Sequence, residues 1–430
     1  TRSLVCRGAR TRCRWRFTFV DYTHDPDAFR LMPKEPSFEN ALAFAGELIS
    51  IPGLPGEEGE VASRLKEEME VLGLSDVRID DTGNVIGVVA GRGGAPPAML
   101  NCHLDVVAEG DHSEWEVPPF SGEVRDGFLH GRGSMDIKGP LALQTYAAAS
   151  MIGKAPGDVI VAHTVLEERG GLGMKRLLES GTVDPGVVII GEATHGDVCI
   201  GHRGRAELEV VLTGLAGHAS APDRARNALD LLGDVLSAVR ELGENQEADP
   251  VLGRASLIAT TVDVLPESRN VIPDKVVLAL DWRILPSDDD DSLLNRVRHS
   301  IERRIPSLQE GLAYEVRMAR ELQTTYTGIQ EQRSLLTPGF LMDSEHPVVT
   351  SAASAVGRRG DDAGAAVRPW LFATDGGWSC GIHGIPTIGF APGEEGFAHT
   401  NRERLNVEEA RWGYARYPHL IAAVQRAAAN

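Results

Sequence analysis

Three apolar runs in this sequence each end in side chains that can bind a metal ion. They are residues 98–102, followed by His103-Leu104-Asp105; residues 161–166, followed by Glu167-Glu168; and residues 187–191, followed by Glu192. Short apolar runs predict buried strands, and α/β sheets bind ligands at the carboxyl ends of their strands. The three runs therefore predict a single site made of imidazole and carboxylate groups.

A glycine-rich turn over residues 131–140 adds another acidic group, Asp136. Such a turn before a helix can bind phosphate, but the phosphate-binding pattern GxGxxG would need glycine at position 136. A carboxylate there repels phosphate and attracts a cation. Asp136 is therefore predicted to be a metal ligand, in a position to bridge two ions.

The spacing of the acidic and histidine residues indicates separate tasks for them. Asp105 can accept a hydrogen bond from the His103 nitrogen that does not bind the metal, and so fix the ring. Successive side chains point to opposite sides of an extended chain. Glu167 and Glu168 are therefore predicted to divide into one metal ligand and one group that faces the reacting water.

His399 lies in a polar, glycine-rich loop after an apolar run at residues 387–390, and Asp375 starts another glycine-rich turn nearby. Asp375 is interpreted as a structural or substrate-shaping residue. Histidines with carboxylates suit zinc, cobalt or manganese, and the number of ligands predicts two clustered ions. Serine hydrolase chemistry is the rival, but no GxSxG pattern occurs at a predicted strand-to-helix turn.

The composition narrows the possible partners. A formal net charge of −19 over 430 residues argues against nucleic acid as a partner. The sequence has no run of eighteen apolar residues, so no membrane helix is expected. Its five cysteines are scattered, which favours a reducing cytoplasm. Six arginines occur in the first sixteen residues, and residues 1–30 are predicted to be a basic, disordered extension, with a transit-like extension as the alternative.

The order of the predicted elements indicates two domains. Strands that alternate with helices predict a mixed α/β sheet covered on both faces. Residues 207–318 differ, because they follow the ferredoxin-like order β-α-β-β-α-β. We therefore expect a catalytic domain made of residues 31–201 and 320–430, with residues 202–319 inserted as a second domain.

Helix boundaries follow from caps and apolar spacing. One helix is predicted after an N-cap at Ser37, and a second over residues 57–72. The first helix of the inserted domain is predicted over residues 227–242. Its buried face is expected to contain Leu229, Leu232, Leu236 and Val239.

Taken in order, these motifs resemble the M20 family of metallohydrolases, which includes acetylornithine deacetylase, succinyl-diaminopimelate desuccinylase, aminoacylase and carboxypeptidase G2. The resemblance covers about residues 37–425 and rests on His103-Leu104-Asp105, Asp136, Glu167-Glu168, Glu192 and His399. It implies that His103 and Glu192 hold one metal ion and that Glu168 and His399 hold the other, with Asp136 between them. Asp105 would orient His103, and Glu167 would be the general base.

The resemblance also implies roles for the inserted domain as a lid and a dimerisation surface. His218, within residues 214–220, would reach the partner subunit's site and stabilise the oxyanion. Asn270 and Arg283 would bind the substrate's carboxylate, a task suited to the forked guanidinium of arginine. For all three residues a purely structural role is the alternative.

The expected activity is hydrolysis of an amide bond in an N-acyl amino acid or small peptide, by a cytoplasmic homodimer with two divalent ions. Zinc is expected, with cobalt or manganese as alternatives. A dipeptidase or carboxypeptidase with the same metals is the rival enzyme. A non-catalytic protein that only binds a ligand in the cleft is the rival from another class, favoured only if a ligand or the base were missing.

Overall fold

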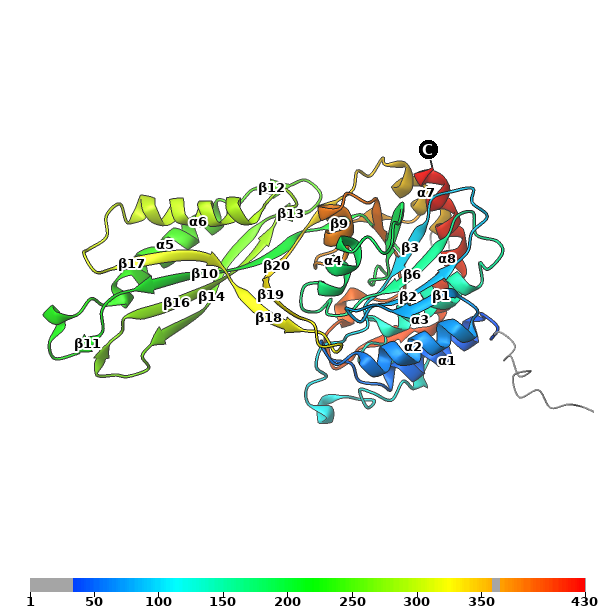
Figure 1. Ribbon diagram of the computed structural model, residues 1–430, viewed down its shortest axis with the longest axis horizontal. Coiled ribbons are helices and arrows are strands. Elements are labelled where there is room, and N and C mark those ends of the chain that lie inside the picture. Colours follow the sequence, from blue (N-terminus) through cyan, green and yellow to red (C-terminus); the bar gives the residue numbers. More distant parts are fainter. Residues whose placement is uncertain (1–33, 358–363, 430) are drawn as a thin grey trace, which may run out of the picture.

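The computed structural model describes residues 34–357 and 364–429, which form two lobes (Figure 1). The first lobe, at the right of the figure, contains a large mixed sheet, and the second lobe, at the left, contains a smaller antiparallel sheet. The predicted extension of residues 1–30 lies outside the described residues. Among the helices that are described, none has the length and apolar character needed to cross a membrane.

The first lobe is built on an eight-stranded sheet. In spatial order its strands are β1 (Ser75–Ile79), β2 (Val85–Val89), β6 (Val159–His163), β3 (Ala98–Asn101), β7 (Val187–Ile190), β23 (Thr387–Gly389), β8 (Val198–Cys199) and β22 (Val367–Arg368). β6, β3, β7 and β23 are parallel, whereas β2 is antiparallel to both β1 and β6. The sheet is mixed, as predicted, and four adjacent parallel strands end at one edge.

Helices cover both faces of this sheet. They are α1 (Phe38–Ile49), α2 (Gly59–Val71), α3 (Lys138–Ala149), α4 (Leu172–Glu179), α7 (Pro347–Val356) and α8 (Val407–Ala428). α1 begins as predicted, because the Ser37 hydroxyl accepts a hydrogen bond from the Asn40 N–H at 3.3 Å. α3 packs against α1, α8 and β6, and all of its residues are buried. Since α3 begins directly after Asp136 and Ile137, its packing fixes the position of the Asp136 turn.

The second lobe contains a five-stranded antiparallel sheet. Its strands are β10 (Gly204–Thr213), β14 (Ser256–Leu265), β16 (Lys275–Ile284), β17 (Ala313–Met318) and β20 (Leu336–Thr337), in the order β14-β16-β10-β17 with β20 paired to β10. α5 (Leu232–Glu244) and α6 (Asp290–Arg304) pack against each other and against this sheet. Buried residues alternate with half-buried ones along β16, which is typical of a sheet with helices on one face.

The first helix of the second lobe differs from its prediction. Its opening turn, Ala228–Leu231, is 3₁₀, and the α-helix begins only at Leu232. A 3₁₀ turn has fewer residues per turn than an α-helix, so the buried face is displaced along the chain. The buried residues of this segment include Leu231, Val235, Ala238 and Val239. Leu229 is 36% exposed, and its predicted place in the core was wrong.

Short strand pairs extend the two lobes. β9 (Gly201–His202) pairs with β21 (Phe340–Leu341), and β11 (Gly217–His218) pairs with β15 (Val271–Ile272) at the end of the second lobe farthest from the first (Figure 1). β18 (Arg320–Thr324) and β19 (Gln330–Ser334) form a hairpin that reaches the first lobe. The remaining pairs are β4 (Val124–Arg125) and β24 (Arg404–Asn406) with β5 (Phe128–His130), and β12 (Ala248–Asp249) with β13 (Gly253–Arg254).

Candidate metal centre

Four parallel strands place metal-binding side chains at one edge of the first lobe's sheet. His103 follows β3, the pair Glu167-Glu168 follows β6, Glu192 follows β7, and His399 lies in the loop after β23. These strand ends are neighbours because the spatial order is β6-β3-β7-β23. The sheet therefore brings these residues together at the edge where α/β sheets bind ligands.

Asp136 lies between the two histidines of this cluster and faces each with a different carboxylate oxygen. Its Oδ1 is 3.2 Å from Nε2 of His103, and its Oδ2 is 3.2 Å from Nε2 of His399. Oε1 of Glu192 lies 3.3 Å from the His103 nitrogen, and Oε1 of Glu168 lies 3.0 Å from the His399 nitrogen. The side chains thus form two groups, each with one histidine and one glutamate, which share Asp136.

These spacings fit a pair of metal ions. Two ligand atoms at about 2.0–2.1 Å from a tetrahedral ion lie roughly 3.3 Å apart, and the four contacts just described range from 3.0 to 3.3 Å. Ligand atoms of His103, Asp136 and Glu168 lie within 4.8 Å of one another, and so do those of His103, Glu167 and Glu192. Glu167 therefore faces the same space as the ligands.

The cluster concentrates negative charge in the protein interior. Burial and the charge of Asp136 raise the pKa of Glu192 to about 7, and burial raises the pKa of Glu167 well above its usual value. Hydrogen bonds with Asp136 and Glu168 raise the pKa of His399 to about 10. Burial raises the pKa of Asp136, but contacts with the two histidines outweigh it and hold that pKa below its usual value. The carboxylates require nearby positive charge, which divalent cations supply.

Asp105 supports the cluster in a way that differs in part from the prediction. Nδ1 of His103 lies 2.8 Å from the main-chain oxygen of Asp105 but 3.6 Å from its carboxylate. The backbone carbonyl therefore orients the ring and leaves Nε2 facing the ligands. The Asp105 carboxylate instead accepts hydrogen bonds from the N–H groups of Glu167 and Glu168, both at 3.1 Å. It fixes the turn that carries these two acids.

Comparison with known proteins assigns the chain to a family. The model of peptidase family M20/M25/M40 matches residues 99–423, which include the whole cluster. The chain belongs to this family. It is therefore an M20 hydrolase, a member of a family that includes dinuclear metal-binding peptidases.

Similar sequences and structures agree with this assignment. Uncharacterized protein YgeY of Escherichia coli (strain K12) is 31% identical over 365 residues, 84% of this chain and 88% of that protein. A succinyl-diaminopimelate desuccinylase of Ruegeria pomeroyi is 30% identical over 317 residues, 71% of this chain and 80% of that enzyme. A tripeptidase structure from Staphylococcus aureus has a TM-score of 0.67 at 22% identity and covers 91% of this chain and 100% of its own. The dinuclear metal-binding M20 peptidase YXEP of Bacillus subtilis has a TM-score of 0.66 at 15% identity, with 90% and 98% covered.

A buried ion pair behind the centre of this M20 hydrolase was not predicted from the sequence. Glu403 accepts hydrogen bonds from the N–H groups of Met135 and Asp136, both at 3.1 Å, and forms an ion pair with Arg132. Both members of the pair are buried, and they hold the backbone of the Asp136 turn. Charged residues flank Glu403 in the sequence, so the local sequence is typical of a solvated surface residue. The only sequence signal for a role at the metal centre is its position shortly after His399.

Asp375 is also a buried supporting residue. Its Oδ2 accepts a hydrogen bond from the Thr164 hydroxyl at 2.7 Å, and Thr164 forms a β-bridge with His103. Burial raises the pKa of Asp375 to about 6. Of the two predicted interpretations, these contacts favour the structural one.

The second-lobe residues that were predicted to act on the substrate do not contact the metal cluster of their own chain within the described residues. His218 is exposed on β11, at the end farthest from the first lobe (Figure 1), and its Nδ1 accepts a hydrogen bond from the Ser220 hydroxyl at 2.7 Å. Asn270 directly precedes β15, the strand paired with β11. Arg283 is on β16 and donates to Asp281 at 2.9 Å. Within the described part of the chain, none of the three forms a hydrogen bond or ion pair with the metal cluster.

Replacement of Glu403 by glutamine is predicted to loosen the Asp136 turn of the M20 centre. It leaves Arg132 buried without an anionic partner, which lowers the free energy of unfolding by about 3–5 kcal/mol. Loss of this support is also expected to weaken the binding of a divalent metal ion by about 10–100-fold. Urea denaturation and calorimetric zinc titration measure the two effects. The matched control, Arg402→Gln at the exposed neighbouring position, should change neither, and a Glu403→Gln variant like wild type in both would contradict the supporting role.

Proposed function

We propose that this M20 hydrolase uses two divalent ions to cleave the amide bond of N-acyl amino acids. The observation that carries the proposal is Asp136, whose two oxygens face two histidines that each contact a glutamate. His103 and Glu192 would hold one ion, and Glu168 and His399 would hold the other. These donors suit zinc, with cobalt or manganese as alternatives. Desuccinylase relatives at 30–31% identity support an acylated amino acid as the substrate.

The protein's own part in the reaction centres on Glu167. When bound, the two ions would lower the pKa of a water molecule and polarise the scissile carbonyl. Glu167 accepts a proton from the attacking water and passes it to the nitrogen of the leaving amine. Burial raises the pKa of Glu167, and the charge of the two ions, when bound, would keep its carboxylate ionised and able to accept the proton. Asp105 keeps Glu167 in place through the hydrogen bond from the Glu167 N–H.

A dipeptidase or carboxypeptidase is the second candidate function. The same centre can cleave a peptide bond by the same proton transfer, and structures similar to this chain include a tripeptidase and a metallo-carboxypeptidase of Sulfolobus solfataricus. At 22% and 16% identity these structures support the fold. A non-catalytic role is disfavoured, because the base and all five ligand positions are present.

We further propose that residues 202–319 act as a ferredoxin-like lid and dimerisation domain inserted into a catalytic domain of residues 31–201 and 320–430. The edge strand β14 supports a homodimer, because it exposes three large apolar side chains: Ile258, Val262 and Leu265. An apolar strand at an open sheet edge favours pairing with another chain.

A homodimer gives a role to the second-lobe residues that lie far from their own centre. His218 and Asn270 share the end of the second lobe farthest from the first (Figure 1), so the partner subunit's centre is the one they would serve. There His218 donates a hydrogen bond to the oxygen on which negative charge develops. Arg283 lies at the other end of β16, paired with Arg205, so it would bind the substrate's carboxylate in its own subunit's site, together with Asn270 of the partner subunit.

A substrate screen tests the proposed function. With zinc, cobalt or manganese supplied, the protein is expected to hydrolyse N-acetyl or N-succinyl amino acids with a kcat/KM about 10-fold or more above that for dipeptides. Activity should vanish with chelation and return with metal, because the ions activate the water. Faster dipeptide cleavage would replace the deacylase by the peptidase, and activity that survives complete metal removal would end the metal proposal.

The control for this screen is Glu167→Ala, which removes the base but none of the five ligands. Its kcat is expected to fall by about 10²–10⁴ while elemental analysis still finds two ions per chain. Full turnover by this variant would show that another group takes the proton.

Subunit mixing tests the role of His218. In a heterodimer of His218→Ala and Glu167→Ala chains, one of the two sites combines an intact Glu167 with the partner's intact His218. The tagged, purified heterodimer is therefore expected to regain about half of wild-type activity, although each homodimer is inactive or impaired. The matched control pairs Glu167→Ala with Glu192→Ala, both in the first lobe, and should stay inactive. A His218 heterodimer with no recovery would contradict sharing between subunits.

A further inference from the structure

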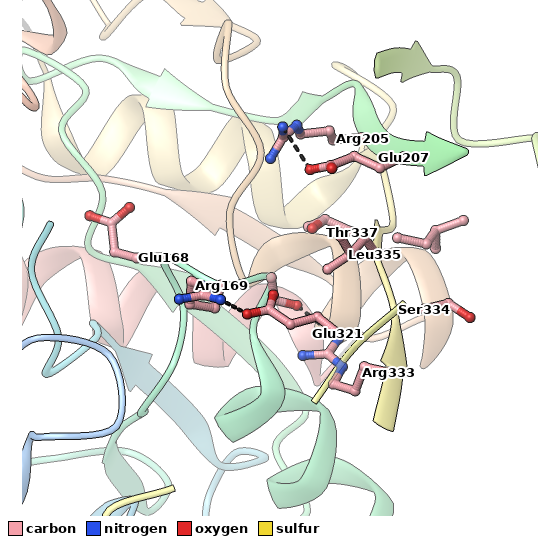
Figure 2. A pocket seen from close by; sticks show the side chains of 11 residues that line it. Glu168, Arg169, Arg205, Glu207, Glu321, Arg333, Ser334, Leu335 and Thr337 are labelled. Carbon is pink, nitrogen blue, oxygen red and sulfur yellow. Dashed lines mark hydrogen bonds and ion pairs between the residues drawn. The ribbon is translucent and has the colours of Figure 1, made fainter. Parts of the chain in front are cut away.

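The hairpin β18–β19 lies beside the turn that carries Glu167 and Glu168. Figure 2 shows Glu168 and Arg169 on this turn, with Glu321 and Arg333 facing it from the hairpin. One of the dashed lines in the figure marks an ion pair between Arg169 and Glu321. The hairpin therefore touches the residues that directly follow the base and a metal ligand.

This turn has a backbone that depends on outside partners. Leu166 has a φ of 57°, in the left-handed region that residues with bulky side chains rarely adopt, and Gly170 follows with a φ of 93°. The N–H groups of Glu167 and Glu168 are held by Asp105. The carbonyl groups farther along the turn need hydrogen-bond donors from outside it, because buried backbone groups are nearly always hydrogen-bonded.

The hairpin supplies these contacts. Nε2 of Gln323 donates to the main-chain oxygen of Arg169 at 2.6 Å, and Nη2 of Arg333 donates to that of Gly170 at 3.0 Å. Nη1 of Arg333 also donates to Oε1 of Gln323 at 3.1 Å, which fixes the two side chains to each other. Trp378 donates to the same Gly170 oxygen at 3.0 Å, and its ring lies 5.3 Å from the Arg333 guanidinium.

Arg333 is a buried cation whose guanidinium donates hydrogen bonds to two uncharged oxygens, the main-chain oxygen of Gly170 and Oε1 of Gln323. Its residue surface is 6% exposed, and burial lowers the pKa of its guanidinium. Within residues 34–357 and 364–429 no carboxylate lies within ion-pair distance of Arg333, although Arg169 pairs with Glu321 nearby. The carboxylates of Glu331 and Asp375 favour the charged guanidinium from beyond ion-pair distance, and the hydrogen bonds with the turn and with Gln323 satisfy its buried N–H groups.

We propose that Arg333 and Gln323 are positioning residues for the base Glu167 and the ligand Glu168. They act through the carbonyl groups of the turn, while Asp105 acts through its N–H groups, so the turn is held from both sides. The hairpin continues directly from β17 and leads into β20, both strands of the second lobe's sheet, so it links that lobe to the metal centre. The part of this proposal that concerns Glu167 rests on the proposed function, in which Glu167 is the base. The part that concerns Glu168 rests on the geometry of the metal centre.

Two variants test the positioning role, Arg333→Gln and Gln323→Ala. Each removes one hydrogen bond to a carbonyl group of the turn and leaves all five proposed metal ligands in place. We expect the affinity for the second zinc ion, measured by calorimetric titration, to fall about 10-fold, as for other residues that orient metal ligands. We expect kcat to fall by a similar factor with KM changed less than about 2-fold. Arg333→Lys, which keeps the charge and one donor, should recover part of both losses.

The matched control is Arg320→Gln on the same hairpin, where the side chain of an exposed arginine donates to the main-chain oxygen of Gln332 at 3.4 Å and interacts electrostatically with Asp290 of the second lobe. It should match wild type in zinc affinity and kcat. Folding of each variant is checked by circular dichroism and Tm. If Arg333→Gln fails to fold, the zinc affinity and kcat of Gln323→Ala test the proposal. Folded Arg333→Gln and Gln323→Ala variants with wild-type zinc affinity and kcat would overturn the proposal. So would losses that merely follow the fraction of unfolded protein.

The zinc titration also separates this proposal from the proposed function. If the wild-type protein hydrolyses none of the tested amides, the proposed function fails, but the zinc affinity of the variants still reports the position of Glu168. If wild type is active and the variants equal it in both measurements, only the positioning role fails.

Discussion

Carboxylates gather inside a protein only where positive charge compensates them, and this constraint shapes the whole first lobe. Asp136, Glu168 and Glu192 have side chains that are 11%, 10% and 7% exposed, and their oxygens converge on two histidine nitrogens. Burial, together with the charge of Asp136, raises the pKa of Glu192 to about 7. Two divalent ions would replace this repulsion by coordination, and would then also support the folded arrangement.

The rest of the structure holds these acids in place against their repulsion. Four parallel strands bring their ends to one edge, and the buried helix α3 fixes the Asp136 turn that Glu403 supports from behind. The turn after β6 is held by Asp105 through its N–H groups and by the hairpin β18–β19 through its carbonyl groups. The proposed base and the proposed ligands other than Asp136 come from the sheet edge, whereas Asp136 comes from the turn before α3. Their precise orientation depends on residues from distant parts of the chain.

This division explains what the sequence could predict. His103, Glu192 and His399 follow apolar runs, and the pattern of a buried strand that ends in a ligand is visible without a structure. Glu403 and Arg333 lie among charged and polar residues, so local sequence gives them the character of a solvated surface. Their burial arises from contacts between segments far apart in the chain. The wrong place given to Leu229 has a local cause, because a single 3₁₀ turn changes the helical phase that spacing alone assumes.

The central claim is that Asp136 is shared between two metal ions, and zinc titration of three proteins tests it most directly. Wild type should bind two zinc ions per chain. His399→Ala should keep one tight site, because His103 and Glu192 remain, whereas Asp136→Ala should lose or greatly weaken both. A wild-type stoichiometry of one, or an Asp136→Ala variant that still binds two ions tightly, would contradict the account.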